Sequence, residues 1–447
     1  MKVLGITGNS GTGKTKISKI ISKQYNAKII DADEIAKSLS KKGTKYFEEI
    51  VNCFGTEIIC GNGELNRVKL AKIVFNSKEK MNILNEITEK YVVEEIIDEI
   101  EKYSKIEKLV VIDVPLLFES KLNEKCEKTI GIIAPKKIKI ERICERDFIS
   151  EEAAEERLSA QKSDEFFMEK CDYIITNDGD IEKVKNQIDL IFNEAIEYKN
   201  LKSVRYIKFK KLSQYQELEH AFVIKPLDFK TSDNLEKNYE KICEVLKIKT
   251  DTIVKPIQTH TDNVCVVDNE KGIHPKELKN VDGLITNKKE KVLSLIFADC
   301  TPIYLYDPVS KVIANIHSGW KGTLQKIAQK AVIKMQENFA CNPANIVCVL
   351  GPTIHKCHFE VDEDVNNLFK KQFEYTNKWN EISKKNEHGK YYIDTILINK
   401  IMLTEAGLKE ENIVDSGICT VCNNKIMHSF RAQKENSGRN TSLIYLK

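Results

Sequence analysis

Residues 8–15 read GNSGTGKT and constrain the first half of the chain more than any other stretch. The apolar run at 2–7 precedes them as a buried strand would, and residues 16–21 follow with helical spacing. A strand, the pattern G-x-x-x-x-G-K-[ST] and a helix, in that order, are the setting of a phosphate-binding loop. Glycines let the backbone wrap a phosphate, and the helix N-terminus adds positive potential. We therefore predict an α/β domain with a parallel sheet that binds a nucleoside triphosphate; a chance glycine-rich turn is the alternative.

Individual positions of this loop have distinct expected roles. Lys14 is expected to reach the β- and γ-phosphates and to act in catalysis, and the Thr15 hydroxyl is expected to ligate Mg²⁺. The predicted nucleotide-binding residues of the loop are Gly8, Gly11, Thr12, Gly13, Lys14, Thr15 and Lys16.

Carboxylates follow two short apolar stretches. Residues 27–30 are expected to form a strand that leads into Asp31 and Asp33, and residues 109–112 another that leads into Asp113. In an open α/β sheet, ligands bind at these strand ends. One carboxylate of the first pair could cap the next helix while the other takes the proton from a substrate hydroxyl. Asp113 resembles a Walker-B carboxylate that orients Mg²⁺.

Arginines follow the strand predicted at 129–133. Arg142 and Arg146 lie in an expected helix, and Arg157 and Gln161 come after a short break. Such arginines suit a mobile lid that clamps the triphosphate in the transition state, with Arg142 as a catalytic residue. Plain surface cations are the alternative.

A fifth strand is expected at 172–176, and Asn177 at its end is placed to meet an adenine. The motifs in chain order are GNSGTGKT, Asp31-Ala32-Asp33, residues 62–67 (NGELNR), 115–119 (PLLFE), Arg142 to Asp147, Gln161 and 172–177 (DYIITN). This ordered set resembles dephospho-CoA kinase over about residues 1–198. The resemblance implies transfer of the ATP γ-phosphate to the 3′-hydroxyl of dephospho-CoA, the last step of coenzyme A synthesis, with Asp33 as the base.

One position departs from that family's pattern. The family usually closes a Leu-Asn helix with His-Pro, whereas Glu89 stands here where the histidine would fall. If that histidine helps to hold the acceptor, affinity for dephospho-CoA is in question. The rival interpretation is another small-molecule or nucleotide kinase on the same fold, because a phosphate-binding loop does not name the acceptor.

The second half depends on residues that lie far apart in sequence. His260 stands alone, whereas Cys300 follows the apolar run 293–297 and His317 follows the run 312–316. Strand ends can converge on one pocket, and two imidazoles with a thiolate suit a tetrahedral Zn²⁺ whose fourth position is open to water or substrate. Taken singly, each residue is more often a core cysteine or a satisfied histidine. Cys300 could also be the nucleophile of a Cys-His hydrolase.

Other polar clusters compete for a role. Residues 355–358 (HKCH) and 419–422 (CTVC) together could supply a structural zinc site. Arg431 and Arg439 precede a final strand expected at 442–446 and could bind a phosphate or another anion, or merely sit on the surface.

A second ordered set of motifs covers about residues 203–447. Its members are Gln258-Thr259-His260, residues 282–286 (DGLIT), 298–302 (ADCTP), 317–322 (HSGWKG), Gly351-Pro352, Phe359 to Val361, Asp394 with Asn399, Cys419-Thr420, and Ser429 to Arg431 with Gly438-Arg439. The set resembles the multicopper-polyphenol-oxidase ("laccase domain") family, whose members are regarded as zinc-dependent purine nucleoside phosphorylases.

This resemblance implies that His260, Cys300 and His317 line the zinc and catalytic centre. It further implies phosphorolysis of purine nucleosides by phosphate, with some adenosine deamination. Lys321 replaces the arginine of the family's His-Ser-Gly-Trp-Arg-Gly pattern, so a phosphate contact made there would lose its bidentate geometry. Copper is the less favoured metal, because the 8 histidines provide no second or third copper cluster.

Length and composition fit this two-domain interpretation. A chain of 447 residues exceeds one ordinary core, and we place the boundary near residue 201, giving domains at 1–200 and 203–447. The 70 basic residues nearly balance the 67 acidic ones, so nucleic acid is not an expected partner. Lysine pairs such as Lys136-Lys137 and Lys384-Lys385 are expected to be solvated.

Residue 1 leads directly into the first apolar run, and no run approaches membrane-spanning length. We therefore expect a cytoplasmic protein whose 13 cysteines are reduced thiols or metal ligands. The overall prediction is a bifunctional enzyme: a kinase domain joined to a second α/β domain with a mixed sheet. A zinc-stabilised binding module is the non-enzyme alternative for the second domain.

Overall fold

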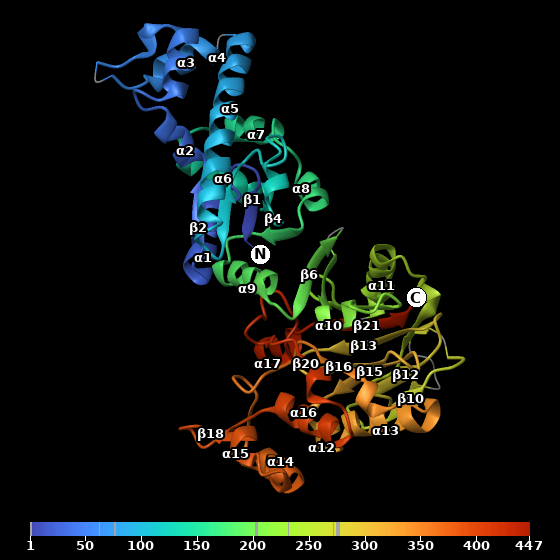
Figure 1. Cartoon of the computed structure of the whole chain (residues 1–447). Helices are drawn as coiled ribbons and strands as arrows, with labels where there is room; N and C mark the ends of the chain where they lie inside the picture. The colour runs from blue at the N-terminus through green and yellow to red at the C-terminus, as the bar shows by residue number, and fades with distance from the viewer. Residues whose placement is uncertain are drawn as a thin grey trace. The chain divides into compact units, whose positions relative to one another are not determined.

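The computed structural model describes residues 2–61, 63–75, 77–201, 204–230, 232–270, 272–273 and 278–447. The chain folds as two compact units, Met1–Ile188 and Asp189–Lys447 (Figure 1). Asn62 of the motif at 62–67, and Lys202 and Ser203 at the expected domain boundary, lie outside the described residues.

The first unit is built on a five-stranded sheet in the order β2-β3-β1-β4-β5, and all four strand pairs are parallel. Parallel neighbours need crossover connections, and helices supply them. The strands are β1 (Val3–Thr7), β2 (Lys28–Asp31), β3 (Val110–Asp113), β4 (Lys128–Ile133) and β5 (Tyr173–Thr176). The helices are α1 (Lys14–Tyr25), α2 (Ala32–Leu39), α3 (Lys45–Phe54), α4 (Arg67–Phe75), α5 (Lys78–Tyr103), α6 (Lys136–Asp147), α7 (Glu151–Ser159), α8 (Asp164–Lys170) and α9 (Ile181–Phe192).

Burial explains why β1 and β3 are largely apolar. All five residues of β1 and all four of β3 are buried, as expected for central strands covered on both faces. Ile96 and Ile100 of α5 pack on β2 and β3, and a separate apolar cluster joins α3 and α4 to the other end of α5. The sheet predicted from the sequence is therefore confirmed, with its strand ends on one edge.

The second unit has two mixed sheets, one of seven strands in the order β11-β9-β13-β21-β8-β7-β6 and one of six in the order β10-β12-β15-β14-β16-β20. A small third sheet has the order β17-β19-β18. The strands are β6 (Ile196–Leu201), β7 (Val204–Phe209), β8 (Leu218–Val223), β9 (Ile253–Lys255), β10 (Val264–Val266), β11 (Gly272–Ile273), β12 (Gly283–Thr286), β13 (Val292–Phe297), β14 (Thr301–Asp307), β15 (Val312–Ser318), β16 (Val347–Leu350), β17 (Glu360–Val361), β18 (Ser383–Lys385), β19 (Tyr391–Ile393), β20 (Ile413–Asp415) and β21 (Asn440–Leu446). The helices are α10 (Lys210–Ser213), α11 (Ser232–Leu246), α12 (Trp320–Leu324), α13 (Ile327–Phe339), α14 (Glu363–Phe373), α15 (Trp379–Ile382), α16 (Thr395–Glu405) and α17 (Phe430–Gln433).

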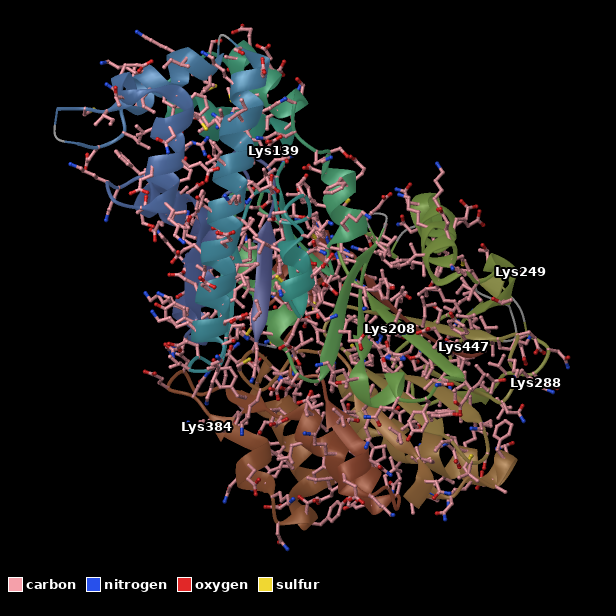
Figure 2. The ribbon with its side chains drawn as sticks, turned by 45° about the horizontal axis from the view of Figure 1, so that its top comes forward. Lys139, Lys208, Lys249, Lys288, Lys384 and Lys447 are labelled. Carbon is pink, nitrogen blue, oxygen red and sulfur yellow. The ribbon has the colours of Figure 1, made fainter. Side chains whose placement is uncertain are left out.

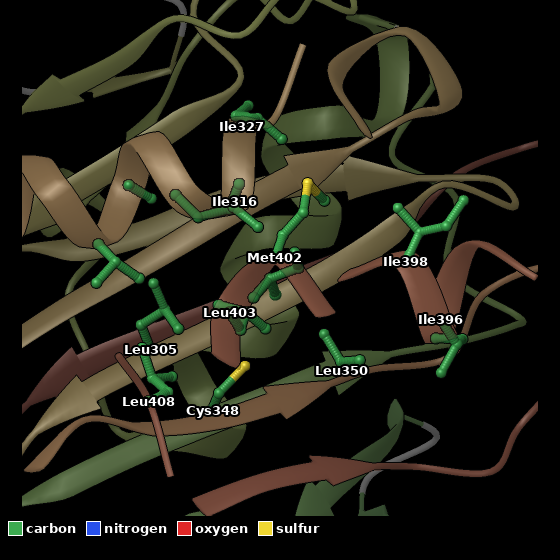
Figure 3. Packing of buried hydrophobic residues seen from close by; sticks show 14 of the residues in the cluster. Leu305, Ile316, Ile327, Cys348, Leu350, Ile396, Ile398, Met402, Leu403 and Leu408 are labelled. Atoms are coloured by element: carbon green, nitrogen blue, oxygen red, sulfur yellow. The ribbon is translucent and has the colours of Figure 1, made fainter. Parts of the chain in front are cut away.

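The two large sheets stack with helices on their outer faces (Figure 1). Asn315 of β15 lies between them and donates a hydrogen bond to Leu293 O of β13 at 3.0 Å. Helices α13 and α16 cover the six-stranded sheet, where Met402 and Leu403 meet Leu305 and Leu350 (Figure 3). Helix α11 covers the seven-stranded sheet. The mixed-sheet α/β prediction is confirmed.

The segment after residue 192 differs from the sequence prediction. The amphipathic spacing that begins at Ile181 predicts a helix through Glu197, followed by a short polar connection. Instead α9 ends at Phe192, and residues 196–201 form β6, which pairs along its whole length with β7. Alternation explains the difference: Ile196 and Tyr198 are buried while Glu197 and Lys199 are not, which is the period of a strand.

The lysine pairs singled out in the sequence are exposed, as predicted; Lys384 is labelled in Figure 2. Lys136 and Lys137 form exposed ion pairs with Glu155 and Glu141. Lys208 and Lys447 both bind the Glu219 carboxylate. None of the helices within the described residues combines the length and apolar character needed to cross a bilayer.

Candidate active sites

The phosphate-binding loop has the backbone geometry that its glycines predict. Gly8, Gly11 and Gly13 have φ values of 144°, 75° and 85°, in a region that residues with a Cβ rarely adopt. A Cβ at Gly8 would also lie 2.3 Å from Ile132 O, and one at Gly11 would lie 2.5 Å from Lys139 O. The loop therefore packs directly on backbone at the end of β4 and in α6, and it leads straight into α1.

Lys14 and Thr15 lie where the loop meets the β3 carboxylate. Lys14 Nζ donates to Gly8 O at 2.7 Å, so it curls over the loop. Burial lowers the pKa of Lys14, and the Asp113 charge opposes this effect. Burial raises the pKa of Asp113, against the charge of Lys14 and hydrogen bonds from Ser18 and Thr15. The hydroxyl and carboxylate expected to hold Mg²⁺ are thus adjacent.

The two carboxylates after β2 have different environments. Asp31 is the N-cap of α2, and its Oδ1 accepts hydrogen bonds from Asp33 N at 2.9 Å and Glu34 N at 3.2 Å. The Asp33 side chain is exposed, and its charge acts on both Lys14 and Arg146. Asp31 therefore shapes the helix start while its charge also acts on Lys14, and Asp33 is the more exposed of the two carboxylates.

Arg142 and Asn177 bind backbone carbonyl groups of the phosphate-binding loop. Arg142 Nη1 donates to Gly11 O at 3.1 Å, and its Nη2 donates to Asn177 Oδ1 at 3.3 Å. Asn177 Nδ2 donates to Thr12 O at 2.7 Å. Both polar atoms of the Asn177 side chain are engaged with these groups. Adenine contact by Asn177 and phosphate contact by Arg142 stay predictions.

The segment after α7 is tied to the loop. Gln161 Oε1 accepts from Ser10 N at 3.0 Å, and its Nε2 donates to Ser10 Oγ at 3.1 Å. In the same region Lys139 pairs with Asp164 at 2.9 Å. Arg146 and Arg157 both bind Asp147. Arg146 and Arg157, two of the arginines expected in a lid, are therefore linked through Asp147, and the lid itself stays a prediction.

In the second unit, His260, Cys300 and His317 come together from three separate segments. Their potential ligand atoms all lie within 4.8 Å of one another. His260 follows β9, Cys300 sits in the turn between β13 and β14, and His317 is in β15. The convergence follows from the stacking of the two sheets, because β13 and β15 belong to different sheets.

Asp282 organises this cluster. Its Oδ1 lies 2.7 Å from His317 Nδ1, which leaves Nε2 of His317 toward the other two residues. Asp282 also accepts backbone hydrogen bonds from Thr259, His260 and Thr261 at 3.2, 3.1 and 2.8 Å. These bonds hold His260 at φ 63°, a conformation that is costly for a residue with a Cβ.

The same contacts shift the pKa values of the cluster. Burial alone would raise the pKa of Asp282, but the hydrogen bond and charge of His317 bring it to about 2. Burial also opposes ionisation of Cys300, yet His317 and His260 lower the pKa of its thiol to about 6. The thiol is therefore readily converted to the thiolate that a metal requires.

Gly319 makes room for the cluster. A Cβ there would lie 2.9 Å from His260 Cδ2 and 3.3 Å from Cys300 Sγ. Its φ is −71°, so space rather than backbone conformation requires the glycine. The donor set, the spacing and this clearance fit a bound metal ion with three protein ligands.

The cluster opens into a cleft of ≈ 750 Å³. Cationic side chains, carboxylates and apolar side chains line it: Lys230, Arg431, Lys434 and Arg439; Asp299, Glu360 and Asp362; and Ile354, Phe359, Trp320 and Phe430. Arg431 lies over the Phe359 ring at 5.8 Å. Lys321 is exposed, lies 5.5 Å from the Trp320 ring centre and is not among the described residues that line the cleft.

A second cluster unites the two cysteine-containing segments. Cys357, His358, Cys419 and Cys422 place their ligand atoms within 4.8 Å of one another. His355, the remaining candidate of that set, is not a member of the cluster. Among the described residues these are the two groups of three or more His, Cys, Asp or Glu with metal-ligand spacing.

Comparison with known proteins assigns each unit. A family described as "Multi-copper polyphenol oxidoreductase laccase" matches residues 221–447, and a family described as "Dephospho-CoA kinase" matches residues 2–183. The dephospho-CoA kinase of Fusobacterium nucleatum is 37% identical over 187 residues, which cover 42% of this chain and 95% of that protein. The chain joins a dephospho-CoA kinase family unit to a laccase-family unit.

Further relatives agree with this assignment. The dephospho-CoA kinase of Listeria monocytogenes is 37% identical over 188 residues, covering 42% of this chain and 94% of that protein. The crystal structure of the Bacillus licheniformis hypothetical protein YfiH matches 54% of this chain and 96% of its own, at 27% identity and a TM-score of 0.50.

In the laccase-family unit, sequence reasoning missed the roles of two aspartates. Asp282 and Asp299 both lie in quoted motifs but were not predicted as site residues. Asp299 accepts from Thr420 Oγ1 at 2.6 Å and from Arg431 N at 2.6 Å. Asp282 directly precedes β12, and Asp299 follows β13. A carboxylate next to a buried strand needs a polar partner, and this position could have indicated that both aspartates belong to a site.

Proposed function

We propose that the dephospho-CoA kinase unit transfers the γ-phosphate of ATP to the 3′-hydroxyl of dephospho-CoA. The observation that carries the proposal is the split of roles between Asp31 and Asp33. Since Asp31 caps α2, Asp33 is left as the exposed carboxylate beside the positive charges of Lys14 and Arg146. A base in that position suits an alcohol acceptor.

In this reaction Asp33 takes the proton of the acceptor hydroxyl as its oxygen forms a bond to the γ-phosphorus. The bond from that phosphorus to the bridging oxygen breaks, and ADP leaves. Lys14 and the backbone N–H groups of the loop bind the phosphate oxygens and orient them for in-line attack. Mg²⁺, held by Thr15 and with Asp113 nearby, would neutralise phosphate charge.

The test is ADP release with ATP, Mg²⁺ and dephospho-CoA, compared between wild type, Asp33→Asn and Glu34→Gln. Glu34 is an equally exposed carboxylate one residue away and serves as the matched control. We expect ADP only when dephospho-CoA is present, a loss of about 10²–10⁴-fold in Asp33→Asn, and wild-type turnover in Glu34→Gln. ATP binding without ADP release would point to another acceptor and to the exposed Glu89 as the reason.

For the laccase-family unit, we propose zinc-dependent phosphorolysis of purine nucleosides, with adenosine deamination as a side activity. The convergence of His260, Cys300 and His317 at the floor of a cleft with four cationic side chains supports it. Zinc held by these three residues would supply a positive charge and one open ligand position. Copper oxidation has less support, because just one of the two clusters in the described residues contains more than one histidine.

The cleft suits both reactants of phosphorolysis. Arg431 and Arg439 provide the planar donors that bind phosphate oxygens in pairs, and Lys230 and Lys434 add charge at the cleft wall. Phe359, Trp320 and Phe430 provide flat apolar surface for a purine. A phosphate oxygen attacks C1′ of the ribose, the bond from C1′ to the purine nitrogen breaks, and the leaving base takes up the proton that the phosphate loses.

The test is to incubate adenosine, inosine and guanosine with phosphate and to measure free base and ribose 1-phosphate. We expect both products in wild type and in His388→Ala, an exposed histidine outside the cleft. In His260→Ala we expect turnover to be lost while the unit stays folded. Ribose in place of ribose 1-phosphate would indicate a hydrolase, and unfolding of His260→Ala would indicate a zinc-stabilised binding module.

A further inference from the structure

The second cysteine–histidine cluster is built from two segments that are distant in sequence. Cys357 and His358 lie between β16 and β17, and Cys419 and Cys422 lie after β20. A parallel bridge between Thr353 and Cys419 joins the segments, with Thr420 N donating to Thr353 O at 2.9 Å and Thr353 N donating to Ile418 O at 3.1 Å. The backbone therefore brings the four side chains together.

Three of four donor distances in the cluster match the edges of a metal tetrahedron, and the fourth, between Cys357 Sγ and His358 Nδ1, is shorter at 3.1 Å. Zinc binds cysteine sulfur at about 2.3 Å and histidine nitrogen at about 2.0–2.1 Å, which gives tetrahedral edges of about 3.8 Å between sulfurs and about 3.6 Å between sulfur and nitrogen. Cys357 Sγ lies 3.9 Å from Cys422 Sγ. His358 Nδ1 lies 3.1, 3.6 and 3.5 Å from the sulfurs of Cys357, Cys419 and Cys422.

A disulfide would have a different geometry. It needs a sulfur–sulfur distance of about 2.05 Å, whereas the Cys357 and Cys422 sulfurs are 3.9 Å apart. A disulfide would also use two of the three thiols and leave the imidazole and the third thiol without a role. The arrangement of all four groups around one point is better explained by a shared ion.

We infer that Cys357, His358, Cys419 and Cys422 bind one zinc ion in a closed Cys₃His site. Four protein ligands fill the tetrahedron, so this ion has no open position for substrate. In this respect it differs from the three-ligand cluster in the cleft. The site is structural, and Cys357 and Cys422 are exposed, so a chelator can reach it.

The site holds one wall of the cleft in place. His358 O accepts a hydrogen bond from Arg431 Nη1 at 2.8 Å, and Thr420, between the two cysteines, donates to Asp299 Oδ1 at 2.6 Å. Asp299 directly precedes Cys300 and accepts from Arg431 N. Fixing both ligand segments therefore positions Arg431 toward the cleft. An effect of this site on turnover depends on the proposed phosphorolysis. Zinc binding by the four residues does not depend on that proposal.

The first experiment counts zinc in the purified full-length protein by elemental analysis. We expect about two zinc ions per chain in wild type and in Cys265→Ser, a control cysteine of the same unit outside both clusters. We expect about one in Cys419→Ser/Cys422→Ser and about one in His260→Ala. An unchanged zinc content in the double serine variant would overturn the inference, whatever the enzyme activity.

A second measurement covers the case in which the double variant fails to fold. Cobalt added to the chelator-stripped full-length chain reports thiolate ligands through sulfur-to-cobalt charge-transfer absorption. His260→Ala should keep most of this absorption, because the Cys₃His site is intact, and His358→Cys should increase it. Loss of the charge-transfer absorption in His260→Ala would contradict the inference. So would cluster cysteines that react as free thiols only after reduction, because they would then form a disulfide.

Discussion

The kinase site and the cleft site are assembled in opposite ways. The kinase loop is a continuous stretch whose shape is set by its own glycines, with φ of 75° at Gly11 and 85° at Gly13. The cleft site draws three residues from three segments and depends on Asp282 to align two of them. The kinase loop is a local feature and can therefore be predicted from the sequence. The cleft site forms only when the two sheets stack.

The largest expected effect is a loss of kinase activity in Lys14→Ala that leaves the second activity unchanged. Lys14→Ala removes the charge that we propose contacts the phosphates, so kinase turnover should fall about a thousand-fold while phosphorolysis stays at the wild-type rate. Parallel ADP-release and ribose 1-phosphate assays on one preparation measure both. A coupled loss of both activities in a still-folded protein would show that the units are not independent.

A smaller effect is expected from the residue on which the cleft site depends. Asp282→Asn keeps the size of the side chain but removes the charge that orients His317, so metal affinity should fall about 10–100-fold. Competition with a metal chelator measures this affinity. Asp262→Asn is a suitable control, since Asp262 carries an exposed ion pair with Lys330 and lies outside the cluster. Equal affinities in the two variants would refute the role of Asp282.

Acid should weaken the two units unequally, because all 8 histidines lie in the second unit, residues 189–447. His220 is buried, accepts a hydrogen bond from Phe209 N at 2.7 Å, and burial lowers its pKa to about 3. As the pH falls below about 6.5, His220 takes up a proton in the unfolded chain but not in the folded one, so stability is lost. At pH 5 the loss should be roughly 2 kcal/mol.

Denaturant unfolding at pH 7 and pH 5 tests this prediction. The transition of the laccase-family unit should move to lower denaturant, and that of the kinase unit should move less. His220→Gln should flatten the pH dependence even if it lowers stability at both values. A pH dependence that is unchanged in His220→Gln would assign the effect to other groups.

The smallest expected effect lies in the kinase unit. Asp31→Ala removes the N-cap of α2 and should cost about 1 kcal/mol of unfolding free energy, whereas Asp31→Asn should cost much less because asparagine also caps helices. Thermal unfolding measures both variants. If the two cost the same, the Asp31 charge rather than its hydrogen bonds stabilises the helix.

Sequence reasoning succeeded where the signal is local. The strands before Asp31 and Asp113 were predicted because a short, largely apolar stretch, 27–30 or 109–112, leads into each carboxylate, and the glycine pattern located the loop. It also found His260, Cys300 and His317, although from motif order and strand ends rather than from contacts.

It failed where a residue's role depends on a distant partner. Asp282 is 35 residues from His317 along the chain, so its position beside an apolar strand could indicate a buried role but not which residue it binds. The two halves of the Cys₃His cluster were considered together, but their spacing alone left the pairing open. β6 was mistaken for a helix end, because its alternation is short and its partner β7 decides its conformation.

The position of β6 bears on how such a fusion can be divided. β6 is the edge strand of the seven-stranded sheet and follows α9 after three residues. A cut near residue 200 would leave this strand on the kinase piece and expose the backbone of β7, an edge that invites aggregation. A cut within residues 193–195 would keep each sheet whole. Gene splitting at these two places should give soluble halves in the second case and a precipitating C-terminal half in the first.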